Sequence, residues 1–322
     1  MSDREPDEDT SVRDAVERSR SGAPAVGEVI RDRFGTDEVF QRIIAAADEE
    51  VTTDARELFF SALAGGFAIT LTFLIYSSMT AKTDGAPLLS ALLYPIGFIY
   101  IILGGYQLYT ENTVPPVALV LERLASVPAM LRQWWIVLVG NFAGGLFGAL
   151  ILAQTGVFSP EAAAAAIDIS QKGVETGFWD LFFKAGFAGL IVAGVVWLDF
   201  AARDTVSRFF LVYIAFLLIP LADLFHVVVS FTELMYLVFL GEAALLPGLV
   251  GFVLPVLLGN TIGGVVLVTL VNYFQTTERR VESTREDGVE RQLSLRELVG
   301  GSSVGRTYVP TDKPTKRRRE DE

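Results

Sequence analysis

The sequence predicts an all-α integral membrane protein of six transmembrane helices, arranged as two inverted three-helix repeats. Hydrophobic residues make up 51% of the 322 residues, more than the core of a soluble domain of this length needs. These residues fall into long apolar runs between 58 and 274. The motif GNFAGG at 140–145 returns as GNTIGG at 259–264, which indicates that one membrane unit is present twice.

Six segments are long enough to cross a bilayer as helices. A helical span needs about 20 apolar residues to cross roughly 30 Å of hydrocarbon. The six segments lie at 58–79, 88–120, 133–155, 177–200, 207–240 and 244–274. Each copy of the repeat holds three of them. Because three is odd, the second copy must enter the bilayer from the opposite side.

The residues before the first span, 1–57, predict an acidic cytoplasmic arm. They include sixteen acidic and eight basic residues, which accounts for most of the net charge of −12. Apolar residues recur at helical spacing around 26–34 and again at 39–47, which indicates two amphipathic helices along the membrane interface or against the bundle. The first ten residues lack an apolar core, so we expect no cleavable signal peptide.

The basic residues of the short loops predict the orientation of the spans. One side of the membrane receives Arg123, Arg132, Arg203, Arg208, Arg279 and Arg280. Only Lys82 and Lys172 fall on the other side, so we expect both termini in the cytoplasm of a multi-pass protein of the cell (plasma) membrane. Residues 58–275 form the predicted transmembrane domain, and the charged tail, 276–322, is predicted to be disordered.

The second and fifth spans are each about 33 residues long, too long for one straight crossing, and both are interrupted. The second reads GGYQLYTEN at 104–112, with two prolines soon after, and the fifth reads PLADLFH at 220–226. We therefore predict two broken helices. Unwound backbone at membrane depth survives only where protein or a water-lined cavity satisfies its polar groups. Interruptions at matching positions of two repeats indicate a permeation site.

His226, the only histidine of the chain, lies in the second interruption. It is 116 residues from Thr110, close to the spacing of 119 between Asn141 and Asn260. We therefore treat Thr110 as its repeat mate and expect the two side chains to meet at the midplane. An imidazole is neutral or cationic near neutral pH, depending on its neighbours. It could attract a weak-acid anion and hand it a proton, so that the neutral form crosses the apolar constriction.

Apolar and aromatic residues flank both interruptions, namely Leu108, Tyr109, Leu224 and Phe225. One interpretation is that they form narrow collars that exclude hydrated ions. The other is that they only pack between helices, and the sequence does not decide between the two.

Carboxyl, amide and amino groups lie near the same region. An ionised carboxyl group at membrane depth costs free energy, and three such groups belong to Glu111, Asp223 and Glu233. They either relay protons or cap the broken helices. Asn141 and Asn260 lie among small residues that let helices approach, and we interpret them as supports for the loop backbone with some pore exposure. Lys172 follows an alanine-rich stretch, a predicted extracellular helix, where it could collect anions.

Several functions are excluded or disfavoured by what the chain lacks. It has no cysteine and one histidine, so we expect no metal site and no haem, which normally needs paired axial ligands. No nucleophile–base pair supports hydrolase or transferase chemistry, and we predict that the protein is not an enzyme and needs no cofactor. The acidic charge argues against a nucleic-acid partner.

Three spaced motifs resemble those of the formate/nitrite transporter family. They are the run GYQLYTEN at 105–112, the repeated GN-x-x-GG, and a histidine 29 residues after Trp197. The resemblance covers roughly 58–274. It implies an aquaporin-like six-helix protomer, a homopentamer with one pore per subunit, and passage of small monovalent anions such as formate, nitrite or hydrosulfide, often with a proton.

The resemblance also implies roles for individual residues. The central histidine of the family matches His226, its loop threonine matches Thr110, and the aromatic residue before that threonine matches Tyr109. The vestibule lysine of the family falls near Lys172.

The chain departs from the common pattern of the family at three positions. Gln107 and Phe225 stand where acids are usual, and Ser230 stands where an asparagine is usual. These changes, together with Asp223 and Glu233, resemble the divergent YfdC-like branch. The leading hypothesis is a proton-linked channel or secondary transporter for a small monovalent anion or its conjugate acid. The alternatives are an aquaporin-like pore for neutral solutes and a membrane anchor that docks a soluble partner through the acidic arm.

Overall fold

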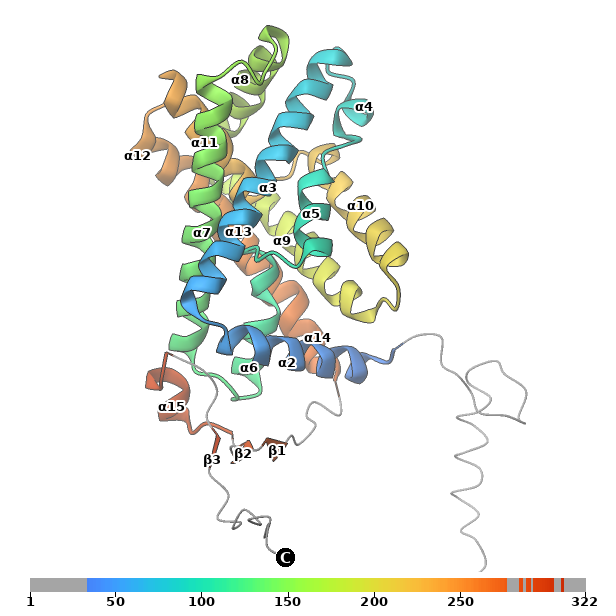
Figure 1. Cartoon of the computed structure of the whole chain (residues 1–322), viewed down its shortest axis with the longest axis vertical. Helices are drawn as coiled ribbons and strands as arrows, with labels where there is room; N and C mark the ends of the chain where they lie inside the picture. The colour runs from blue at the N-terminus through green and yellow to red at the C-terminus, as the bar shows by residue number, and fades with distance from the viewer. Residues whose placement is uncertain (1–33, 277–283, 286–287, 291, 304–307, 310–322) are drawn as a thin grey trace, which may run out of the picture. The chain divides into compact units, whose positions relative to one another are not determined.

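The computed structural model describes residues 34–276, 284–285, 288–290, 292–303 and 308–309. Their secondary structure is almost entirely helical (Figure 1). The elements of the first half are α2 (Thr36–Thr52), α3 (Ala55–Lys82), α4 (Pro87–Ala91), α5 (Ile96–Gly104), the 3₁₀ turn η1 (Glu111–Thr113), α6 (Pro115–Leu121) and α7 (Val127–Gln154). The second half contains α8 (Pro160–Glu175), α9 (Phe178–Ala201), α10 (Thr205–Leu221), α11 (Val227–Leu240), α12 (Leu245–Gly248), the π-helix η2 (Leu249–Val253), α13 (Leu254–Ile262), the π-helix η3 (Gly263–Leu270) and α14 (Val271–Gln275).

Five helices in the described part of the chain are long and apolar enough to cross a membrane. They are α3, α4 with α5, α7, α9 and the continuous run from α12 to α14. Of the expected fifth span, α10 has 17 residues and α11 has 14, so each alone is shorter than the roughly 20 residues that a crossing needs. A sixth crossing would use both halves, and the six-span count stays a prediction.

Both predicted interruptions are present. The helix α5 ends at Gly104, and regular α-helix resumes only at Pro115 with α6. The helix α10 ends at Leu221, and α11 begins at Val227. Pro220 lies in the last turn of α10, where its missing N–H and its ring disfavour continuation of the helix. The two breaks separate half-helices, as the lengths of the two spans predict.

The two halves of the bundle are built around matching helix pairs. The helix α3 packs along α7 in the first half, and α9 packs along α13 in the second. A side chain on Gly66 would overlap the backbone oxygen of Asn141, and one on Gly189 would overlap that of Asn260. Glycine is therefore required at equivalent positions of both pairs, because only it permits this close approach of two backbones.

The amphipathic helix predicted around 39–47 is confirmed as α2. Its buried residues include Val39, Phe40, Ile43 and Val51, and it packs against α6 and α9. The other predicted amphipathic segment, around 26–33, lies outside the described residues.

Part of the tail has structure where the sequence predicts disorder. Residues 295–300 form α15, whose first turn carries a capping box of Ser294 and Glu297. The backbone of Leu293 donates to the carbonyl of Arg123 at 2.7 Å, and Arg123 Nε donates to the carbonyl of Leu293 at 2.8 Å. These two bonds tie the tail to the loop before α7. The three short strands β1 (Thr284–Arg285), β2 (Gly288–Glu290) and β3 (Tyr308–Val309) pair antiparallel in that order.

Candidate transport site

The side chains of Thr110 and His226 meet between the two interruptions. The distance from Thr110 Oγ1 to His226 Nε2 is 2.8 Å, and each residue is 1% exposed. The ring of Phe98 stands edge-on to the imidazole, with ring centroids 5.0 Å apart. The expected contact between hydroxyl and imidazole is therefore present in a buried part of the bundle.

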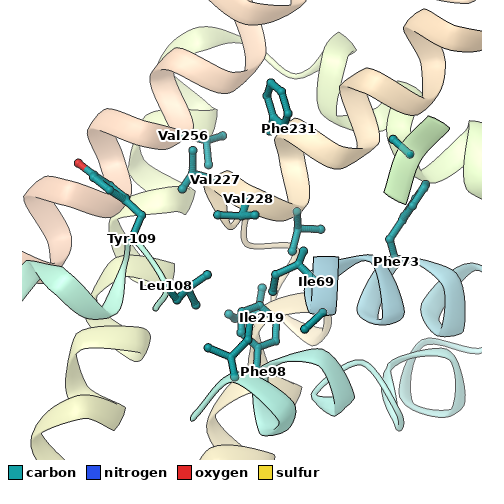
Figure 2. Close-up of a cluster of buried hydrophobic side chains, with 14 of the residues drawn as sticks. Ile69, Phe73, Phe98, Leu108, Tyr109, Ile219, Val227, Val228, Phe231 and Val256 are labelled. Carbon is teal, nitrogen blue, oxygen red and sulfur yellow. The ribbon is translucent and has the colours of Figure 1, made fainter. Parts of the chain in front are cut away.

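Phe98, which contacts His226, belongs to a cluster of buried apolar side chains. Figure 2 shows Leu108, Phe98 and Ile219 close together, near Val227 and Val228 at the start of α11. Leu108 is fully buried. We call this buried apolar cluster the apolar constriction, because a hydrated ion would have to lose its water to enter it.

Two asparagines hold the interrupted backbones in the same way. Asn141 accepts a bond from the backbone of Tyr109 at 2.8 Å and donates to the carbonyls of Ala62 and Gln107. Asn260 accepts from the backbone of Val227 at 2.8 Å and donates to the carbonyls of Ala185 and Phe225. Both amides are fully buried. Each therefore satisfies two backbone groups of an interrupted segment and also bonds a carbonyl of a neighbouring uninterrupted helix, α3 for Asn141 and α9 for Asn260.

This equivalence corrects the repeat register. Asn141 bonds Tyr109 and Asn260 bonds Val227, so Leu108 rather than Thr110 is the structural mate of His226. The register inferred from sequence was wrong by two residues because no side-chain motif marks the bonded amides. Thr110 and His226 still meet, since the two breaks converge on the same place.

A cavity of about 230 Å³ lies on one side of the interruptions. Its wall includes Glu50, Glu111 and Asp199, with the amides of Gln107 and Asn112. Among the described residues that line it there is no lysine, arginine or histidine. Of the three carboxyl groups, Asp199 is paired with Arg208, whose Nε lies 3.5 Å from Asp199 Oδ1.

A second cavity, of about 70 Å³, lies against His226. Ser230 and Glu233 of α11 line it together with Lys172 and Asp223. In the described structure the two cavities share no lining residue, and Leu108 and Thr110 line neither.

The predicted collar residues divide into two groups. Leu224 and Phe225 are partly buried and line the smaller cavity. Leu108 and Tyr109 belong to the buried core, and the Tyr109 hydroxyl lies 2.9 Å from Thr261 Oγ1.

The charged candidates are also distributed over the two cavities. Glu111 lines the larger one, and Asp223 and Glu233 line the smaller one. Lys172 forms an ion pair with Asp223, and each side chain is 57% exposed. Lys172, which the sequence suggested as a collector of anions, thus has a carboxylate partner. The sequence did not reveal this pairing because the two residues are 51 positions apart.

The structure adds a polar network that the sequence analysis missed. Gln133 Nε2 donates to Glu50 Oε2 at 3.1 Å and to Asn112 Oδ1 at 2.8 Å. Asn112 in turn donates to Gln107 Oε1 and to the carbonyl of Leu108. The network therefore connects α2 with the backbone of the apolar constriction.

Burial raises the pKa of Glu50 from 4.5 to about 7, an effect that the hydrogen bond from Gln133 only partly offsets. One sequence signal could have found this residue. Glu50 lies seven residues after Ile43 and three after Ala47, on the apolar face of an amphipathic helix, where an acid is unusual.

We predict that Glu50 makes the docking of α2 depend on pH. A folded-state pKa above the ordinary value stabilises docking fully below about pH 4.5, and this contribution is lost as the pH rises through about 7. Hydrogen exchange of the α2 amides, corrected for intrinsic rates, should be about tenfold faster at pH 8 than at pH 5.5. Glu50→Gln should remove this difference, and Glu49→Gln, at an exposed position, should retain it. Equal pH dependence in wild type and Glu50→Gln would contradict the prediction.

Residues 37–274 match the sequence profile described as formate/nitrite transporter. The chain belongs to this family. It is 30% identical to the inner membrane protein YfdC of Escherichia coli over 242 residues, which cover 74% of this chain and 77% of YfdC. The family membership and the predicted YfdC-like branch are thereby confirmed, and the family consists of membrane transporters rather than enzymes.

Solved structures show the same fold. A structure described as an FNT family ion channel superposes with a TM-score of 0.66 at 20% identity, over 74% of this chain and 99% of that one. A pentameric formate channel with formate bound superposes with a TM-score of 0.59 at 20% identity, over 69% of this chain and 97% of that one. The predicted all-α membrane fold is confirmed by these similarities, and the chain is a multi-pass membrane protein.

Proposed function

We propose that this protein is a channel or secondary transporter for small monovalent anions of the formate or nitrite type, or for their conjugate acids. The observation that carries the proposal is the contact of Thr110 with His226 between two interrupted helices, with a cavity on either side. Membership of the formate/nitrite transporter family and the fold shared with a pentameric formate channel support it.

The proposal includes proton exchange at His226. A bare anion pays a large desolvation penalty at an apolar constriction, whereas its neutral acid does not. The imidazole is the titratable group at this constriction, and Thr110 holds its Nε2. His226 would donate a proton to the arriving anion, and Leu108 would restrict passage to the small neutral acid.

The other candidate residues have supporting roles in this proposal. Asn141 and Asn260 hold the backbone of the breaks. Leu224 and Phe225 narrow the smaller cavity, and Tyr109 braces the constriction through Thr261. The carboxyl groups of Glu111, Asp223 and Glu233 exchange protons with the solute, and Lys172 attracts anions to the cavity mouth.

We further propose a homopentamer in the plasma membrane with both termini in the cytoplasm. Large aromatic side chains face outward from the described bundle, namely Trp135, Trp179, Phe183 and Phe187. Such surfaces suit lipid or a neighbouring protomer. The fold similarity to a channel described as pentameric supports five subunits, and the arginine-rich loops support the orientation.

Uptake into proteoliposomes tests the proposed function. We expect formate and nitrite to enter faster than into protein-free vesicles. If His226 supplies the proton, the initial rate should rise as the external pH is lowered, because the imidazole must take up a new proton for each anion that crosses. Absence of flux for both solutes would contradict the proposal. Flux of neutral solutes that ignores pH would favour the aquaporin-like alternative.

A further inference from the structure

Three polar side chains lie on one face of α11. His226 immediately precedes the helix, and Ser230 and Glu233 follow four and seven residues later, a spacing that places residues on the same helical face. All three line the smaller cavity. The rest of α11 is mostly apolar, so its polar groups are concentrated toward this cavity.

Two of these side chains have an unused hydrogen-bonding atom. Within the described part of the chain, His226 Nδ1 and Ser230 Oγ have no hydrogen-bond partner. Each residue is only 1% exposed. An unsatisfied buried polar group costs about 1–3 kcal/mol, and a solute in the cavity that bonds both atoms would remove this cost.

The position of the two atoms limits the chemistry of such a solute. They belong to successive turns, which are about 5.4 Å apart along a helix axis. A solute with two oxygen atoms on one carbon or nitrogen can bond both, with one oxygen for each. Hydrosulfide has a single non-hydrogen atom and can satisfy only one of them well.

The surrounding charges limit its protonation state. Lys172 at this cavity is paired with Asp223, and Glu233 as a whole residue is 7% exposed. Once His226 has given its proton to the solute, the neutral acid can donate to Nδ1 and accept from Ser230 Oγ, whereas an anion offers acceptors only. The cavity volume of about 70 Å³ leaves room for a small acid.

We propose that His226 Nδ1 and Ser230 Oγ form a two-point binding site for a small acid with two oxygen atoms on one centre. Ser230 is then a specificity residue, which favours such an acid over hydrosulfide. This inference deepens the proposed transport function and rests on it.

The single histidine makes binding directly observable. The full-length chain, labelled with ¹⁵N-histidine and purified without a histidine tag, is placed in lipid nanodiscs and titrated with formate. We expect a saturable shift of the Nδ1 resonance. In Ser230→Ala the apparent Kd should rise about two- to tenfold, the range expected for one hydrogen bond.

Ser77→Ala is the matched control. Ser77 is also fully buried with an unpartnered hydroxyl, but in the described structure it does not line the cavity. Its variant should bind formate as the wild type does. An unchanged Kd in Ser230→Ala, or an equal change in both variants, would overturn the two-point site.

Flux measurements separate this inference from the proposed function. In proteoliposomes, Ser230→Ala should lower the ratio of formate to hydrosulfide uptake by about the same two- to tenfold, and Ser77→Ala should not. Absence of formate flux in the wild type refutes the proposed function, whereas the Kd comparison still tests the site. Wild-type flux with an unchanged ratio in Ser230→Ala refutes the site alone.

Discussion

Replacing His226 with phenylalanine should abolish the pH dependence of formate uptake. It should also lower the uptake rate at neutral pH about a hundredfold, which is the lower end of the range expected when a proton-transfer group is lost. Phenylalanine keeps a flat ring beside Phe98 but has no proton to exchange and no bond for Thr110. The measurement is initial uptake into proteoliposomes at a series of external pH values.

His226→Gln separates the titration from the hydrogen bond. The amide can still bond Thr110 Oγ1, but it does not titrate between pH 5 and 8. We expect this variant to assemble normally and to transport slowly at every pH, because an amide has no proton to donate to the anion. If either variant kept the wild-type rate and pH profile, His226 would have no part in the mechanism.

Replacing Asn260 with leucine should cause a large loss of stability. The change leaves the amide of Val227 and the carbonyls of Ala185 and Phe225 without their partner. A buried unsatisfied group costs about 1–3 kcal/mol, so the midpoint of thermal unfolding in detergent should fall by about 10 °C. Formate flux should fall with it, because α11 begins at the amide that Asn260 holds.

Two further variants make this prediction specific. Asn141→Leu should lower the midpoint by a similar amount, because Asn141 makes the same three bonds in the other half. Asn272→Leu should change it little, because in the described structure the Asn272 amide makes one hydrogen bond, to the carbonyl of Val268 one turn earlier in the same membrane segment. A small effect at Asn260 and a large one at Asn272 would contradict the assigned roles.

The pH dependence predicted for the docking of α2 also concerns the larger cavity, because Glu50 lines it. Glu50 is bonded to Gln133, which also bonds Asn112, and Asn112 holds the carbonyl of Leu108. These bonds form a continuous hydrogen-bonded path from α2 to the backbone of Leu108. The pH dependence at Glu50 and that at His226 are distinguishable, since only the first alters hydrogen exchange in α2.

The sequence predicted those features that depend on local composition or on a repeated motif. Apolar length predicted the membrane spans, and the repeated glycine and asparagine motif predicted a duplicated unit. The polar interruptions predicted where Thr110 and His226 would meet. These features follow from burial of apolar surface and from the need to satisfy backbone groups in lipid, and both can be read along the chain.

Only the tertiary structure decided which distant groups share a site. Glu50 reaches the larger cavity from a helix outside the bundle, Lys172 pairs with Asp223, and residues 292–303 return to Arg123. Likewise, only the structure shows that His226 Nδ1 and Ser230 Oγ have no hydrogen-bond partner among the described residues. The sequence by itself determined the helices, the breaks and the family, because these depend on local composition and motif. Partners and cavities depend on packing between segments far apart in the chain, which no local pattern records.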